Sequence, residues 1–330
     1  MLIDTCKRIN DVHSLEDLSC IESVGLFEEF YEPDMVYHYT SPEGLLGILG
    51  ITKNDATPCL RFTRADYVND ASEGSYILDI YGKVLYELYE NHDVNEEFYN
   101  TFRDIEIAHT ALFEKSSGSF KQANSHVYIC CFSVSNDSLP MWNYYTKNGK
   151  YEGYSIGVSI GDFQELEKLG SAGNRYVPFY KIIYDKVAQE KTIGTLLTKV
   201  QSLLINGSVL SAFAKSIIAR LISGWSLFYK SEYFEHEKEV RAVIHIPSEA
   251  PVIESKDKDS TKNNYKVKYR ENQGLIIPYI EYPVDKAVFY DITVAPGIKD
   301  ESATSSIVHL IKSNGFVNSD VQRSKIPVRF

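Results

Sequence analysis

One apolar run near the middle of the chain constrains the fold more than any other feature. It spans residues 127–134 and reads Val-Tyr-Ile-Cys-Cys-Phe-Ser-Val. Its length and its β-branched and aromatic side chains are typical of a strand buried in a sheet. The chain is therefore expected to fold around a β-sheet that carries a substantial core.

The rest of the sequence alternates between strand-like and helix-like patterns. Short β-prone runs predict strands at residues 36–40, 60–64, 154–160, 177–184, 239–246, 287–294 and 321–328. Apolar residues at helical spacing predict helices at residues 44–49, 71–113 with a break near 91–95, 162–169, 187–229 and 300–313. Pro140 opens a further short helix, and residues 254–272 read as a polar loop or hairpin. This mixture predicts an α+β fold.

The predicted organisation is one domain with additions. Residues 1–34 are acidic and weakly helical and are expected to form an N-terminal helical extension. Residues 35–330 are expected to form a single α+β domain with helical insertions near 71–113 and 187–229. We therefore look for functional residues in the α+β domain.

Composition narrows the possible partners. The chain has 24 Tyr and 16 Phe, and this aromatic content favours a sheet-rich protein with ring faces available for stacking. Its formal net charge is −11, so no overall positive field attracts polyanions. A nucleic-acid partner would have to be bound by a local basic patch.

Cysteine usage and apolar segments bear on metal and location. Five cysteines are present without a C-x-x-C pair, and Cys130 and Cys131 are expected to point to opposite faces of a strand, which argues against a zinc site. No signal-peptide pattern or long uninterrupted apolar segment occurs. We expect a cytoplasmic protein that needs no metal and does not enter a membrane.

Several common catalytic patterns are absent or weak. Neither the dinucleotide-binding glycine pattern nor the P-loop occurs. Gly153 to Gly157 match the G-x-S-x-G pattern of hydrolases, but the predicted strand continues past Ser155, which favours packed small residues over a nucleophile. Asp66, Asp70 and Glu73 lie at helical spacing and could hold a cation, although an acidic capping box explains Asp70 and Glu73 better.

His38, Tyr39, Thr40 and Ser41 place four hydrogen-bonding side chains at the end of a predicted strand. Together they could hold a polar ligand. The alternative is structural: His38 would be a satisfied core imidazole, and Ser41 followed by Pro42 would cap the next helix.

A second candidate group is Glu237, Glu239 and Arg241. At a spacing of two on a strand their side chains would share one face, where neighbouring carboxylates raise one pKa and the arginine opposes that effect. Such carboxylates can hold a sugar hydroxyl or stabilise a positive transition state, whereas the alternative is a solvated acidic edge. Trp142 and Tyr145 could stack on a planar ring or could pack in the core.

The order of these motifs from residue 36 to residue 329 resembles a widespread bacterial family of unknown function. The matching residues are His38-Tyr39-Thr40-Ser41 with Gly47-Ile48-Leu49, Phe62, Asn69-Asp70-x-x-Glu73, Cys131-Phe132-Ser133, Met141-Trp142-x-x-Tyr145, Gly153, Glu237-x-Glu239-x-Arg241 and Ser324-Lys325-Ile326-Pro327-x-Arg329.

That family in turn resembles the ADP-ribosyltransferases, including the poly(ADP-ribose) polymerases and toxins that modify nucleic acids. The resemblance implies a split β-sheet that binds NAD+ in its cleft. It implies that His38 binds a ribose hydroxyl, that the Tyr39 backbone binds the nicotinamide amide, and that Glu239 or Glu237 stabilises the oxocarbenium-like state. Candidates to pack on nicotinamide are Ser133, Trp142 and Tyr145, and the remaining predicted NAD-binding residues are Thr40, Ser41, Asn69, Asp70 and Arg241.

The expected function is an NAD-dependent mono-ADP-ribosyltransferase that modifies a macromolecule, in the role of a toxin or anti-phage effector with a possible neutralising partner. Basic residues between 181 and 230 and the many tyrosines mildly favour a nucleic-acid acceptor over a protein; these basic residues are Lys181, Lys186, Lys191, Lys199, Lys215, Arg220 and Lys230. One alternative is a catalytically inactive nucleotide- or nucleic-acid-binding module. Another is a metal-dependent hydrolase or nuclease that uses Asp66, Asp70 and Glu73.

Overall fold

The computed structural model describes residues 30–51, 57–68, 72–105, 125–146, 151–169, 177–207, 211–247, 266–272 and 274–328. These residues form two compact units. A sheet unit contains the described residues within 30–67, 125–182 and 234–328, and a helical unit contains those within 68–105 and 183–233. The mixture of a large sheet with several helices confirms the predicted α+β class.

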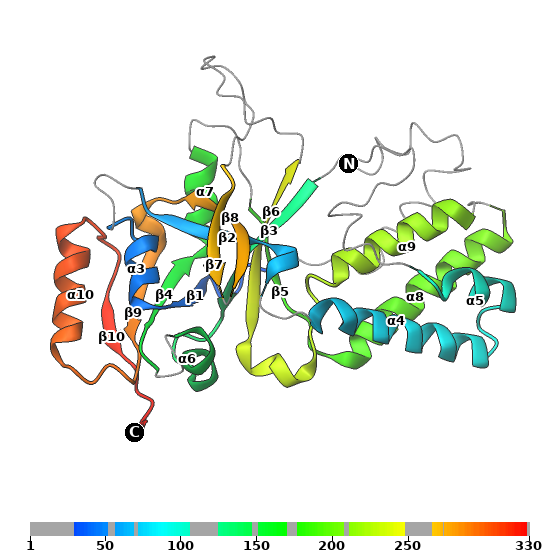
Figure 1. The fold of residues 1–330 in the computed structure, drawn as a ribbon, viewed down its shortest axis with the longest axis horizontal. Coiled ribbons are helices and arrows are strands. Elements are labelled where there is room, and N and C mark those ends of the chain that lie inside the picture. The colour runs from blue at the N-terminus through cyan, green and yellow to red at the C-terminus, as the bar shows by residue number, and fades with distance from the viewer. Residues whose placement is uncertain are drawn as a thin grey trace, which may run out of the picture. The chain divides into compact units, whose positions relative to one another are not determined.

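The sheet unit is built on one branched sheet (Figure 1). Its main path follows the order β10-β9-β4-β1-β3-β2-β8-β7, while β6 pairs with β3 and with β5. The pairs are antiparallel except for β9 with β10. The strands are β1 (Met35–Thr40), β2 (Cys59–Arg64), β3 (Ser125–Ser133), β4 (Tyr154–Ser159), β5 (Phe179–Lys181), β6 (Glu239–Pro247), β7 (Lys268–Asn272), β8 (Leu275–Pro283), β9 (Phe289–Val294) and β10 (Val321–Arg323).

The sheet splits at β3. One edge of β3 pairs with β6 along its whole length. The opposite edge is shared, because Ser133 pairs with Tyr37 of β1 whereas Tyr128 pairs with Arg64 of β2. Between those two contacts, over residues 130–132, β1 and β2 therefore diverge along the same edge.

Helix α3 (Pro42–Ile48) contacts the strands on both sides of this split, β1 and β2. It begins as the sequence predicts, with Ser41 as the N-cap and Pro42 in the first turn. Its buried residues Leu45 and Ile48 belong to the main core together with Phe62 and other side chains of the strands. The helix thereby fixes the end of β1 that carries the first motif.

Three further helices and three short 3-10 turns complete the described part of the sheet unit. The helices are α6 (Leu139–Tyr145), α7 (Ile160–Leu169) and α10 (Ser302–Ser313), and the turns are η1 (Ala65–Tyr67), η2 (Glu232–Glu237) and η3 (Lys286–Val288). The first two residues of η2 fall in the helical unit and the rest in the sheet unit. The predicted short helix at Pro140 and the predicted helices at 162–169 and 300–313 are confirmed.

The helical unit has its own apolar core. Its helices are α4 (Ser72–Glu90), α5 (Glu96–Phe102), α8 (Lys186–Ile205) and α9 (Ser211–Trp225). Fully buried Ile77, Leu196 and Ile218 are part of this core. The expected break between α4 and α5 is confirmed, and Asn95 caps α5 by accepting a hydrogen bond from the Phe98 amide at 2.8 Å.

The structure differs from the predicted strands at β5, β8 and β10. Strand β8 lies where no strand was predicted, because Pro278 interrupts its apolar pattern and proline normally argues against a strand between two neighbours. The predicted strands at 177–184 and 321–328 are shortened to β5 and β10. Beyond Arg323 the chain is held by side-chain hydrogen bonds instead of a strand ladder.

Candidate site at the split of the sheet

The three main motifs lie on neighbouring strands. Tyr37 of β1 is in register with Ser133 of β3, and Ser133 is in register with Glu239 of β6. Since adjacent strands are about 4.8 Å apart, the first-motif strand and the third-motif strand are separated by roughly 10 Å. Segments two hundred positions apart in the sequence are thus brought into one row across the sheet.

His38 lies where β1 leaves β3. Its Nδ1 is 2.9 Å from the carbonyl oxygen of Cys131, and its ring meets Phe132 edge-on with ring centroids 5.7 Å apart. The ladder between β1 and β3 is formed at Tyr37, so this bond extends the connection by one residue into the split. The imidazole therefore ties the first motif to the second.

The surroundings of His38 favour the neutral imidazole. Burial is the main cause that lowers its pKa, and the charge of Arg270 lowers it further, whereas the hydrogen bond to Cys131 raises it. A neutral ring that donates from Nδ1 carries an acceptor at Nε2. This second nitrogen has the character needed to accept a hydrogen bond from a ligand hydroxyl.

The other residues of the first motif contribute to the local structure. The Tyr39 hydroxyl donates to the carbonyl oxygen of Ser135 at 2.7 Å, and its ring packs edge-on against Trp142 at 4.6 Å. The Ser41 hydroxyl accepts a hydrogen bond from the Gly44 amide at 3.1 Å. Thr40 ends β1 and lies half-buried beside Gly44. These contacts hold the strand end and the start of α3 in place.

Glu239 and Arg241 form a buried ion pair on β6. The guanidinium donates to both carboxylate oxygens, with Nε at 2.7 Å and Nη2 at 3.1 Å, and the two residues are only 4 % and 2 % exposed. A positive charge at this distance stabilises the ionised carboxylate. Cys131 of β3 is in register with Arg241, and burial first and then Glu239 raise the pKa of its thiol.

Glu237 is not part of the strand, contrary to the prediction that it shares a strand face with Glu239. It ends η2, and Lys238 then adopts a positive φ of 46°, which breaks the alternation before β6 begins. Glu237 is buried, and its carbonyl oxygen accepts a hydrogen bond from the Ser133 hydroxyl at 2.7 Å. Glu237 therefore lies in a 3-10 turn and Glu239 in a strand.

The second-motif residues are mostly enclosed. Ser133 is fully buried, and its hydroxyl also accepts from the Ser135 amide at 3.1 Å. Trp142 is fully buried, so its ring packs in the core. Tyr145 is half-buried at the edge of the same small cluster, which makes it the most accessible aromatic ring of the predicted nicotinamide contacts.

Asp137 connects the second motif to the C-terminal motif, and the sequence analysis did not identify it. Its Oδ1 accepts from Trp142 Nε1 and from the Ser324 hydroxyl, each at 2.7 Å, while Oδ2 accepts from the Lys325 amide at 2.9 Å. The available signal was an acid three residues before Pro140, at the start of the predicted helix.

Some predicted residues cannot be placed. Asn69 and Asp70 lie outside the described residues, as do the side chains of Asp66 and Glu73. Within the residues that are described, no group of three His, Cys, Asp or Glu side chains is arranged to hold a metal ion. In the same residues, no helix has the length and apolar character needed to cross a membrane.

Ser155 lies within β4, which continues past it, and it is completely buried. The sharp strand-to-helix turn of a hydrolase nucleophile is therefore not formed here. The small residues around Ser155 serve close packing, as the sequence indicates.

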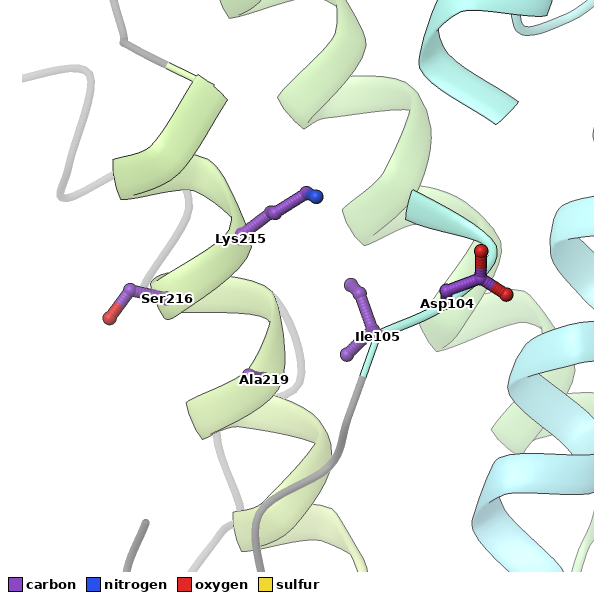
Figure 2. Close-up of a pocket in the computed structure, with 5 residues that line it drawn as sticks. All are labelled: Asp104, Ile105, Lys215, Ser216 and Ala219. Atoms are coloured by element: carbon purple, nitrogen blue, oxygen red, sulfur yellow. The ribbon is translucent and has the colours of Figure 1, made fainter. Parts of the chain in front are cut away.

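A shallow cavity occurs in the helical unit (Figure 2). It has a volume of about 370 Å³ and is lined by Asp104, Ile105, Lys215, Ser216 and Ala219. Of these residues only Lys215 belongs to the predicted basic stretch, and no predicted NAD-binding residue lines the cavity.

Comparison with known proteins gives one family match. Residues 141–242 match a family described as "Protein of unknown function (DUF2971)". The matched segment contains Trp142, Tyr145, Glu237, Glu239 and Arg241, in agreement with the predicted resemblance to a family of unknown function. No curated protein and no solved structure matches the chain.

Proposed function

We propose that this protein is an NAD-dependent mono-ADP-ribosyltransferase whose site lies at the split of the sheet. The observation that carries the proposal is the adjacency of β1, β3 and β6: Tyr37, Ser133 and Glu239 lie in one row across the three strands, and His38 follows Tyr37 where β1 diverges. A split in an ADP-ribosyltransferase-like sheet provides a place for a dinucleotide without a glycine-rich phosphate loop.

The chemistry requires a fixed negative charge. When the bond between nicotinamide and ribose breaks, its electron pair leaves with nicotinamide and positive charge develops on the ribose. An acceptor nucleophile then bonds to the anomeric carbon and loses its proton. Glu239, which Arg241 keeps ionised and oriented, would stabilise the developing charge, and His38 Nε2 would accept a hydrogen bond from a ribose hydroxyl.

The acceptor in this proposal is a macromolecule in the cytoplasm, with nucleic acid favoured over protein, and the biological role is a toxin or an anti-phage effector. The tyrosine content and the basic residues between 181 and 230 support this choice. A protein that neutralises such an activity would be a natural partner.

One observation favours a second candidate function. Glu239 is 4 % exposed and both of its oxygens are engaged by Arg241, which is also the arrangement of a structural ion pair. A module that binds NAD or a nucleic acid without cleaving the glycosidic bond would preserve this pair.

The decisive measurement is nicotinamide release from NAD by the purified full chain, with and without total RNA or DNA. Glu239→Gln and His38→Ala should each reduce release at least roughly 100-fold, as expected when a transition-state contact is lost. The exposed Glu301→Gln and His309→Ala on α10 are matched controls and should keep full activity.

Other results point elsewhere. NAD binding without nicotinamide release by the native chain would favour the inactive module. Release that survives in both site variants would contradict the proposal, and loss of activity on chelation would favour a metal-dependent hydrolase or nuclease. Circular dichroism of each variant separates a lost contact from a lost fold.

A further inference from the structure

Two arginines lie on the β2-β8-β7 part of the sheet, and these strands are near the centre of Figure 1. Arg61 of β2 and Arg270 of β7 are both exposed. The Arg61 guanidinium lies over the ring of Tyr279, 5.3 Å from its centroid, and Arg270 Nη2 is 3.5 Å from the Thr63 hydroxyl. Thr63 and Tyr279 are in register, so both arginines rest on one shared platform.

Neither arginine has an acidic partner among the described residues, and the register gives a reason. Glu281 is directly opposite Arg61 in the ladder between β2 and β8, but its carboxylate pairs with Lys268. Among the residues that the structure describes, no carboxylate forms an ion pair with Arg61 or Arg270. Within the described part of the chain, these two positive charges have no carboxylate partner, on a protein whose formal net charge is −11.

Electrostatics indicate that the two guanidiniums are close enough to repel. Desolvation is the main cause that lowers the pKa of Arg270, and the charge of Arg61 is the next. The charge of Arg270 also contributes to the lowered pKa of His38. An anion bound between like charges relieves their repulsion, and a guanidinium offers paired N–H donors that match the oxygens of a phosphate.

We propose that Arg61 and Arg270 form a binding site for phosphate oxygens, either the pyrophosphate of a dinucleotide or the backbone of a single-stranded nucleic acid. The site goes beyond the proposed activity, because it is argued from charge and geometry and needs no catalytic step. Tyr279 and Thr63 hold the two guanidiniums on the same face of the sheet.

The test uses the full chain and two defined probes, inorganic pyrophosphate by calorimetry and a fluorescent single-stranded oligothymidylate by anisotropy. Arg61→Gln and Arg270→Gln should each weaken binding about tenfold, as expected when a charge-assisted hydrogen bond is lost. Arg61→Lys should lose less, because it keeps the charge without the planar fork. Arg103→Gln is the control, since Arg103 is exposed and its neighbour Asp104 provides a carboxylate at 3.4 Å.

The two probes identify the source of the phosphate. Weakened binding of pyrophosphate supports a dinucleotide site, and weakened binding of the oligonucleotide alone supports a nucleic-acid backbone site. Unchanged affinity in both glutamine variants, an equal loss in Arg103→Gln, or no binding of either probe by the native chain would overturn the inference. Because the assay measures binding, its outcome is separate from that of nicotinamide release, which is tested through Glu239.

Discussion

The imidazole of His38 acts at the position where a backbone ladder is interrupted. Its Nδ1 satisfies the carbonyl oxygen of Cys131 at the split, and an unpaired buried carbonyl would cost free energy. The structural interpretation of His38 and the ligand-binding one are therefore compatible, because each uses a different ring nitrogen. In the proposed function the same residue would hold the split in place and offer Nε2 as an acceptor to a ribose hydroxyl.

The lowered pKa of His38 predicts a pH-dependent stability. In the unfolded chain the imidazole has its ordinary pKa of 6.5, so on acidification the unfolded state takes up the proton first. The stabilising contribution is complete above pH 6.5 and decreases as the pH falls through the lower folded pKa, by at most about 1.4 kcal/mol per pH unit. Urea unfolding at pH 7.5 and pH 5 should show a smaller loss in His38→Asn than in the native chain.

Asparagine can donate from the position of Nδ1 but does not titrate in this range. His309→Asn, an exposed substitution on α10, should leave the native pH dependence unchanged. An identical pH dependence in His38→Asn and the native chain would show that His38 titrates alike in both states.

The buried pair of Glu239 and Arg241 predicts a large stability effect. Arg241→Met removes the counter-charge and leaves a carboxylate at 4 % exposure, which should cost about 3–5 kcal/mol in the free energy of unfolding. Lys83→Met breaks the exposed pair with Glu190 and should cost less than about 1 kcal/mol. The measurement is urea unfolding at pH 7.5, and similar losses in the two variants would contradict a buried, ionised pair.

At the scale of elements, local chemistry made most boundaries predictable. Ser41 with Pro42 marks the start of α3, and the gap before Asn95 marks the start of α5. Strand β8 was not predicted because Pro278 interrupts its apolar pattern. Its pairing with β2 and β7 stabilises the strand. Contacts between distant elements could not be predicted from the sequence pattern. Asp137 has the local sequence of an ordinary turn residue, and its role depends on a hydrogen bond from Ser324, nearly two hundred positions away.

The candidate site shows the same contrast between features that the local sequence predicts and features that depend on distant contacts. The register shows that β1, β3 and β6, the strands that carry the three motifs, are neighbours. That their side chains form one site is what the resemblance implies, and it stays a prediction. The turn at Lys238 was not predictable, because a positive φ at lysine has no clear sequence signal. The placement of Arg61 and Arg270 on one face of the sheet depends on the register of three strands, which short sequence patterns do not determine.

The space around Gly153, just before β4, shows how tightly the first motif and the end of α6 pack. A Cβ atom there would lie 2.5 Å from the carbonyl oxygen of Thr40 and 2.7 Å from Cγ2 of Thr146. Gly153→Ala should therefore destabilise the protein by about 1–3 kcal/mol, since backbone must shift. Gly82→Ala in α4 meets no atom within 4 Å and should stabilise the protein by about 0.5–1 kcal/mol. Thermal unfolding measures the change in stability of both variants. A change of the same sign in both would contradict this packing.

At the scale of the whole molecule, the two units have separate apolar cores. The core of the sheet unit includes Ile156 and Ile292, and the core of the helical unit includes Leu196 and Ile218. The helical unit is formed by separate segments of the chain, and strands of the sheet unit lie between these segments in the sequence. Of the described motif residues, Glu73 of α4 belongs to the helical unit and the others belong to the sheet unit.

Separate cores predict separate responses to cavity-forming substitutions. Ile218 and Ile292 are both 0 % exposed, so either change to alanine should cost about 2–5 kcal/mol. Amide hydrogen exchange should rise mainly in α8 and α9 for Ile218→Ala and mainly in β4 and β9 for Ile292→Ala, because exchange reports the stability of each cooperative unit. Conservative Ile→Val changes at the same positions should give the same pattern at smaller amplitude. A uniform rise in both units for either alanine variant would mean that the chain unfolds as one cooperative body despite its two cores.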